Sequence, residues 1–189
     1  MKLIEEIENY VPYNDTEVKE KEIFLDYINR FDDVLTRKNE IIHFTSSALV
    51  LNEKRDKALM IHHNIYNSWY PPGGHADGDE DLLNVATKEV GEETGLKNIK
   101  VLDDNIFSLE TFPILTHFKR GAWVSAHIHA NVTYLLEASE EEVLEIKEDE
   151  NSNVAWIPIN ELVDAIADIH LKHVYEKLIK KAKELEIIK

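Results

Sequence analysis

Three carboxylates with the spacing of a metal site occur in one short stretch of the chain. Residues 69–96 read WYPPGGHADGDEDLLNVATKEVGEETGL, a Pro-Pro-Gly-Gly turn, an acidic loop and a predicted helix that ends at Gly95. At about 100° per residue, Glu89, Glu92 and Glu93 share one flank of that helix. Like charges at this spacing destabilise an isolated helix, so a compensating cation is expected. Oxygen ligands favour Mg²⁺ or Mn²⁺, which commonly hold substrate phosphates.

The alternative interpretation of these glutamates is a solvated acidic face, which is what charged runs usually are. The other flank of the predicted helix carries Leu83, Ala86 and Val90 and can face a core. Five of the six glycines of the chain fall within 23 consecutive residues of this stretch. Backbone freedom is therefore concentrated beside the carboxylates.

The stretch resembles the Nudix box of the Nudix hydrolase family, with every spacing kept. The matching positions are Gly74, Glu80, Lys88, Glu89, Val90, Glu92, Glu93, Gly95 and Leu96. Lys88 stands where the family usually has an arginine. The positive charge is kept, but an ammonium is a point charge and lacks the planar fork of a guanidinium.

The resemblance implies an α/β fold, a Nudix-type α/β/α sandwich with a mixed sheet. It also implies hydrolysis of a diphosphate linkage, commonly in a nucleoside diphosphate joined to another group. Mg²⁺, or else Mn²⁺, would be bound by Glu89, Glu92 and Glu93, and it would activate a water that attacks phosphorus. The candidate catalytic residues are Glu92, Glu93 and Glu150, and the general base stays open between the last two. Gly73 and Gly74 are candidate substrate contacts.

Two histidines are further candidates for substrate binding. Residues 121–136 alternate apolar and polar side chains and predict one long strand, on which His127 and His129 share a face. Their spacing suits two metal ligands or two phosphate contacts, but no third imidazole is placed beside them by the sequence. The alternative is that they merely line the polar face of the sheet.

The remaining elements frame this region. An amphipathic helix is predicted over residues 14–35, where Asn14 and Glu17 have the form of a capping box. It belongs to an N-terminal helical extension, residues 1–40, before a Nudix domain over residues 41–189. Strands are predicted at 41–51, 57–62 and 154–159, and Asn160 is expected to cap the terminal helices. The extension must bury its apolar stripe on the domain or in a homodimer.

Composition excludes several other functions. The net charge of −16 repels polyanions. The expected partner is therefore a small diphosphate substrate and not a nucleic-acid polymer. No segment predicts a membrane span or a signal peptide, which predicts a cytoplasmic protein. The chain has no cysteine, which excludes thiolate chemistry and argues against an isoprenoid diphosphate isomerase of the same fold. A non-catalytic sensor of nucleotides or nucleotide sugars is the alternative to an enzyme.

Overall fold

The computed structural model describes residues 2–119 and 121–189. Its elements follow in the order α1 (Lys2–Asn9), α2 (Asp15–Arg30), β1 (Ile42–Asn52), β2 (Lys57–His63), β3 (Ser68–Tyr70), β4 (Gly73–His75), α3 (Leu82–Thr94), β5 (Ile99–Ile114), β6 (His117–Lys119), β7 (Ala122–Val124), β8 (His127–Ala138), β9 (Asn151–Pro158), α4 (Leu162–Ala165) and α5 (Ile169–Glu184). Within the described ranges, no helix has both the length and the apolar character that a membrane crossing needs.

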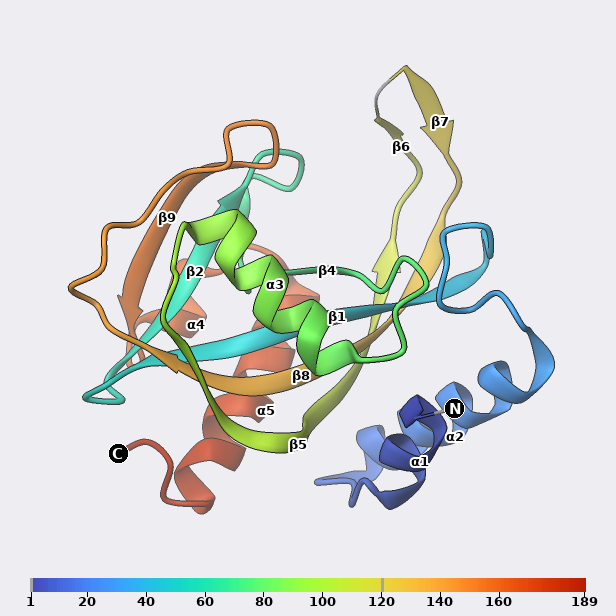
Figure 1. Ribbon diagram of the computed structural model, residues 1–189, viewed down its shortest axis with the longest axis horizontal. Coiled ribbons are helices and arrows are strands. Elements are labelled where there is room, and N and C mark those ends of the chain that lie inside the picture. The colour runs from blue at the N-terminus through green and yellow to red at the C-terminus, as the bar shows by residue number, and fades with distance from the viewer. Residues whose placement is uncertain (1, 120) are drawn as a thin grey trace.

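A mixed sheet of seven strands forms the centre of the molecule (Figure 1). The parallel pair β1–β8 runs from Ile42 opposite Ile128 to Asn52 opposite Ala138. β5 pairs antiparallel with β8 along the other side. β4 and β2 pair antiparallel with opposite ends of β1, and β9 pairs along β2. The sheet therefore places β4 next to the first half of β1, where the glycine-rich turn begins.

Helices cover both faces of this sheet, because alternate residues of a strand point to opposite sides. On β1, Phe44 and Val50 lie in a core shared with α1, α2 and α3. Leu49 and Leu51 lie in a second core, shared with α4 and α5. In Figure 1, α3 crosses in front of the sheet and α5 lies behind it. The predicted α/β/α sandwich is confirmed.

The N-terminal helices belong to the first of these cores. The side chain of Asn14 accepts a hydrogen bond from the Glu17 backbone N–H at 2.9 Å, so the predicted cap is confirmed. The helix ends at Arg30 and not near residue 35, because Phe31 has extended backbone angles and a turn follows. Phe24 is fully buried against the sheet. The expectation that the extension packs on the domain is therefore met within one chain.

Side chains satisfy the outer backbone groups of the edge strand β5. The N–H of Thr111 donates to Oε1 of Glu20 at 2.9 Å. The carbonyl of Leu109 accepts a hydrogen bond from Nζ of Lys177 at 2.8 Å, and that of Phe107 accepts one from α5 as well. Side chains of α2 and α5 thus supply hydrogen bonds that a neighbouring strand would otherwise make with this edge.

Two further details of the sequence prediction are wrong. The single strand over 121–136 is broken at Ser125 and Ala126, because β7 pairs with β6 in a projecting hairpin whereas β8 pairs with β1 and β5 (Figure 1). Asn160 caps no helix. α4 follows Glu161, which makes no side-chain cap, and α5 is capped by Asp168, whose carboxylate accepts two backbone N–H bonds.

Candidate active site

The glycine-rich stretch folds as the strand β4, a loop and the helix α3. The carboxylate of Asp81 caps the start of α3 by accepting the N–H of Asn84 at 3.1 Å. Gly95 ends the helix with a φ of 78°, a left-handed conformation that a glycine adopts without strain. Ala86 and Val90 are fully buried on the core side of the helix. This packing fixes the rotation of α3 and turns its glutamate flank toward β4.

The three box glutamates are held in different ways. Glu93 is only 4% exposed, and its Oε2 accepts the backbone N–H of Gly73 at 2.9 Å. The carboxylate of Glu89 lies against Gly74, where a Cβ would be 2.3 Å from its carboxyl carbon. Glu92 is the most open of the three, with 45% of its side chain exposed. Gly74 thus leaves room for the Glu89 carboxylate in this position, from which a Cβ would displace it.

Burial and mutual repulsion disfavour the ionised carboxylates. Burial raises the pKa of Glu93 to about 8, against the hydrogen bond from Gly73, and the charges of Glu89 and Glu150 raise it further. Burial also raises the pKa of Glu89, with Glu92 as the next cause. Such a cluster of acidic oxygens gains from a bound cation, because a cation favours the ionised form.

The loop before β9 brings two further charged residues to this cluster. The ammonium of Lys147 lies 2.8 Å from Glu150 and 4.0 Å from Glu92. Asn151 anchors the loop, since its side-chain amide donates to the backbone carbonyl of Glu93 at 3.1 Å. Glu150, predicted from sequence, is therefore close enough to Glu89 and Glu93 to raise the pKa of both.

Sequence reasoning missed Lys147. The one available signal was its position as the single lysine in the acidic run of residues 137–150. Its positive charge partly neutralises the glutamates. Lys88, the departure from the usual arginine, also contacts the cluster, at 3.4 Å from Glu92 across one helical turn. Two ammonium groups therefore flank the most exposed of the three glutamates.

The donor set fits a hard divalent cation. Glu89, Glu92 and Glu93 offer only carboxylate oxygens, and Glu150 adds another carboxylate beside them. Oxygen ligands with room for retained waters suit Mg²⁺ or Mn²⁺ better than softer metals. The half-open position of Glu92 leaves a side from which a phosphate can approach.

The two predicted histidines lie in a different group of side chains. Nδ1 of His127 is 2.8 Å from the carbonyl of Ser125, and its Nε2 is 3.1 Å from Nε2 of His129. The rings of His43 and His75 stand beside them, at 5.0 and 4.8 Å from the ring of His129. The sequence had placed no third imidazole there, and the structure places two.

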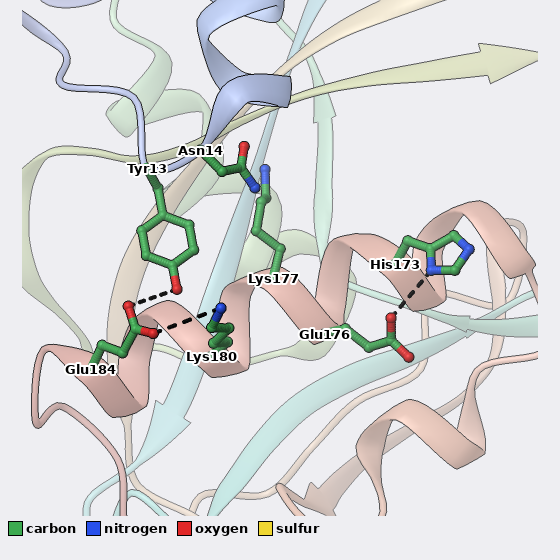
Figure 2. Close-up of a pocket in the computed structure, with 7 residues that line it drawn as sticks. All are labelled: Tyr13, Asn14, His173, Glu176, Lys177, Lys180 and Glu184. Atoms are coloured by element: carbon green, nitrogen blue, oxygen red, sulfur yellow. Dashed lines mark hydrogen bonds and ion pairs between the residues drawn. The ribbon is translucent and has the colours of Figure 1, made fainter.

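A separate hollow of about 460 Å³ lies between the start of α2 and the helix α5. Figure 2 shows that its polar side chains face one another: the hydroxyl of Tyr13 donates to Glu184 at 2.7 Å, and His173 lies 3.2 Å from Glu176. None of the box residues lines it. Its polar groups are thus already paired, and we do not assign it a role.

The comparison with known proteins decides the family. The NUDIX domain model matches residues 42–178, more than half of the chain. The chain belongs to the Nudix family. The assignment made from the box is confirmed, and so is the class of activity expected of it, hydrolysis of a diphosphate linkage by an enzyme of a family that uses a divalent metal.

Curated relatives of this Nudix protein are named for RNA substrates. It is 30% identical over 125 residues to an RNA pyrophosphohydrolase of Pelagibacter ubique, covering 65% of this chain and 78% of the relative. It is 41% identical over 88 residues to the m7GpppN-mRNA hydrolase NUDT17 of Xenopus laevis, covering 46% of this chain and 27% of the relative. The chain thus spans most of the first relative and less than a third of the second.

Solved structures show the same fold at low identity. An Ap4A hydrolase of C. elegans superposes with a TM-score of 0.55 at 16% identity, over 76% of this chain and 97% of the other. The Nudix hydrolase RenU of M. smegmatis gives a TM-score of 0.55 at 15% identity, over 76% and 87%. At these identities the likeness supports the fold alone.

Proposed function

We propose that this Nudix protein is a magnesium-dependent hydrolase of a diphosphate linkage in a small, nucleotide-derived molecule. The observation that carries the proposal is that two of the three glutamates on one flank of α3 contact β4, Glu93 at Gly73 and Glu89 at Gly74. A solvated acidic face would not need a buried Glu93 with a raised pKa. The proposed substrate contacts are the backbone of Gly73 and Gly74.

The residues divide into holding and proton-transfer roles. Glu89, Glu92 and Glu93 would hold the metal, which when bound would neutralise charge on the phosphate oxygens and acidify a water. Gly73 fixes one oxygen of Glu93 through its N–H. Glu150 lies on a loop outside α3 and is our candidate base, with Glu93 as the other choice. The ammonium of Lys147 lies 2.8 Å from the carboxylate of Glu150 and pairs with it.

The substrate class follows from charge. A net charge of −16 opposes extended contact with a polyanion, so we propose a small substrate even though the curated relatives are named for RNA ends. The roles of His127 and His129 toward substrate, a homodimer and a cytoplasmic location stay predictions from the sequence.

A panel of substrates tests the proposal. The protein is incubated with nucleoside triphosphates, nucleotide sugars, dinucleotide cofactors, dinucleoside polyphosphates and a 5′-triphosphorylated RNA, each with and without Mg²⁺. We expect Mg²⁺-dependent release of phosphate or nucleotide from a small substrate. Binding without turnover of any substrate would favour the non-catalytic sensor, and turnover of RNA alone would contradict the small-substrate proposal.

Metal-linked stability gives an independent check. Because Mg²⁺ would bind only the folded protein, a free concentration one hundred times its dissociation constant should add about 2.7 kcal/mol of stability. Glu92→Gln and Glu93→Gln should each lose most of that shift and nearly all activity. Glu186→Gln, an exposed residue at the end of the chain, serves as the control and should change neither.

A further inference from the structure

Four histidines from three strands meet at one place in the sheet. His43 and His129 are direct partners in the parallel pair β1–β8. His75 on β4 is the partner of Thr45, which lies on the same face of β1 as His43. His127 precedes His129 by two residues on the same face of β8. The ring centroids of His43 lie 4.8–5.1 Å from those of the other three. We call these four residues the histidine cluster.

Backbone carbonyls orient two of the rings. Nδ1 of His43 is 2.9 Å from the carbonyl of Asn39, and Nδ1 of His127 is 2.8 Å from the carbonyl of Ser125. A carbonyl oxygen only accepts, so each Nδ1 carries the hydrogen and each Nε2 presents a lone pair. An imidazole held by a backbone carbonyl through one nitrogen is the usual arrangement of a histidine that binds metal through the other.

The lone pair of His43 has no partner. His43 is 4% exposed, and its Nε2 is buried without a hydrogen bond. Leaving such a nitrogen unsatisfied is costly, so an ordinary packed histidine would normally find a donor. The His43 ring lies beside the rings of the other three histidines. A donor is therefore missing at the point where the rings converge.

Hydrogen bonding within the cluster does not resolve the arrangement. Neutral imidazole is the form that coordinates a metal. A single hydrogen shared between His127 and His129 at 3.1 Å would still leave His43 without a partner.

The distances suit a small transition-metal ion. One ligand nitrogen from each of His43, His75 and His129 lies within 4.8 Å of the other two. Tetrahedral zinc with bonds of about 2.1 Å needs nitrogens about 3.4 Å apart, so rotations of the side chains close the difference. The 3.1 Å between His127 and His129 is already near that value. Nitrogen-only ligation favours Zn²⁺ over Mg²⁺.

We propose that His43, His75 and His129 form a Zn²⁺ site, with His127 as the fourth ligand. The site is separate from the glutamate site, although the two are adjacent in the chain: Gly74 lies against Glu89, and His75 is the next residue. Successive residues of a strand point to opposite faces, so the zinc site lies across β4 from the glutamates. A bound ion would tie β1, β4 and β8 together directly behind the strand that positions Glu89.

Metal titration of the full chain tests the site. The protein is dialysed against a chelator, and Zn²⁺ and Co²⁺ are then added in separate experiments, the first followed by calorimetry and the second by visible absorption. We expect one equivalent of Zn²⁺ to bind, and Co²⁺ to give the intense absorption of a tetrahedral complex. The same result is expected for the Glu92→Gln/Glu93→Gln double variant, which separates this site from the glutamate site.

Variants of the accessible ligands complete the test, because a His43 variant could fail to fold. His75→Gln should weaken Zn²⁺ binding at least a hundredfold and abolish the absorption spectrum of tetrahedral Co²⁺. His127→Gln should weaken it about tenfold, with the circular dichroism of both variants unchanged. His170→Gln and His173→Gln, exposed histidines on α5, are the matched controls. Failure of the glutamate double variant to bind one equivalent, or unchanged binding by His75→Gln, would overturn the proposal.

Discussion

Glu89 and Gly74 constrain each other, and this contact offers the sharpest residue-level test. Gly74→Ala would place a Cβ 2.3 Å from the Glu89 carboxyl carbon, but that carboxylate is the end of a flexible side chain and can move. We expect the variant to fold, with a melting temperature within about 2 °C of the parent. Its kcat/KM should fall at least tenfold, because the displaced carboxylate no longer holds metal.

A double-mutant cycle shows whether this loss passes through Glu89. In a Glu89→Ala background the carboxylate is gone, so adding Gly74→Ala should have little further effect on kcat/KM. Fully additive losses would mean that Gly74 acts on the substrate directly. The measurement needs only steady-state kinetics on the four proteins.

Lys88 tests the one departure from the usual box. Its ammonium lies 3.4 Å from Glu92 and is well exposed, so it contributes charge more than geometry. We expect Lys88→Arg to preserve or raise turnover. A tenfold loss, equivalent to about 1.4 kcal/mol of transition-state stabilisation, would show that the surrounding residues are fitted to lysine.

The three glutamates were predictable from sequence as one group because they share one helix. Glu89, Glu92 and Glu93 could be aligned because helical geometry fixes neighbours three and four apart. His43 and His129 could not, since their contact depends on parallel pairing of strands more than 80 residues apart in the chain. Lys147 depends on a loop whose position is set by Asn151 and the end of α3.

At the scale of elements, α2 carries a buried carboxylate to the edge of the sheet. Burial raises the pKa of Glu20 to about 7, and Oε2 of this residue is buried without a partner. In the unfolded chain the group ionises near pH 4.5, so the unfolded state releases its proton first as the pH rises. The contribution of Glu20 to the free energy of unfolding is therefore greatest below about pH 4.5 and decreases as the pH rises to about 7.

Glu20→Gln should remove that pH dependence while keeping an acceptor for the N–H of Thr111. From pH 5 to pH 8, the unfolding free energy of the variant should rise by about 1–3 kcal/mol relative to that of the parent. Urea unfolding of both proteins at each pH measures this change. Glu22→Gln is the control on the exposed face of the same helix. A parent–variant difference that is constant with pH would contradict the raised pKa.

The contact between α2 and the sheet can also be tested through Phe24. This ring is fully buried and meets Phe44 of β1 edge to face at 5.3 Å. Phe24→Ala should cost about 3–5 kcal/mol of folding free energy. Val18→Ala, at an exposed position of the same helix, should change it by less than about 0.5 kcal/mol. Equal effects would show that the helix is not part of the core.

Elements with local signals were predictable, and those set by distant partners were not. The cap at Asn14 and the stop at Gly95 are short-range, and both are confirmed. The strand β5 contains Asp103, Asp104 and Asn105, and its register with β8 is irregular there, so alternation gave no clear strand signal. The boundary of the extension at residue 40 stays a prediction.

Charge acts at the scale of the whole molecule. With a net charge of −16, the protein repels an anionic substrate before any contact forms. Raising KCl from 20 to 200 mM at constant free Mg²⁺ should therefore increase kcat/KM about twofold by screening this repulsion, while kcat changes little. A fall in kcat/KM with salt would mean that local cations such as Lys147 outweigh the net charge.

The side chains that satisfy the outer edge of β5 also decide how folded molecules meet. A bare edge strand offers a template on which another chain can add a strand, and such addition is a common start of aggregation. Here Glu20 and Lys177 already occupy hydrogen-bonding positions on that edge. Strand addition there would first have to break contacts with both α2 and α5. This side of the sheet is thereby protected against edge-to-edge polymerisation for as long as those two helices stay docked.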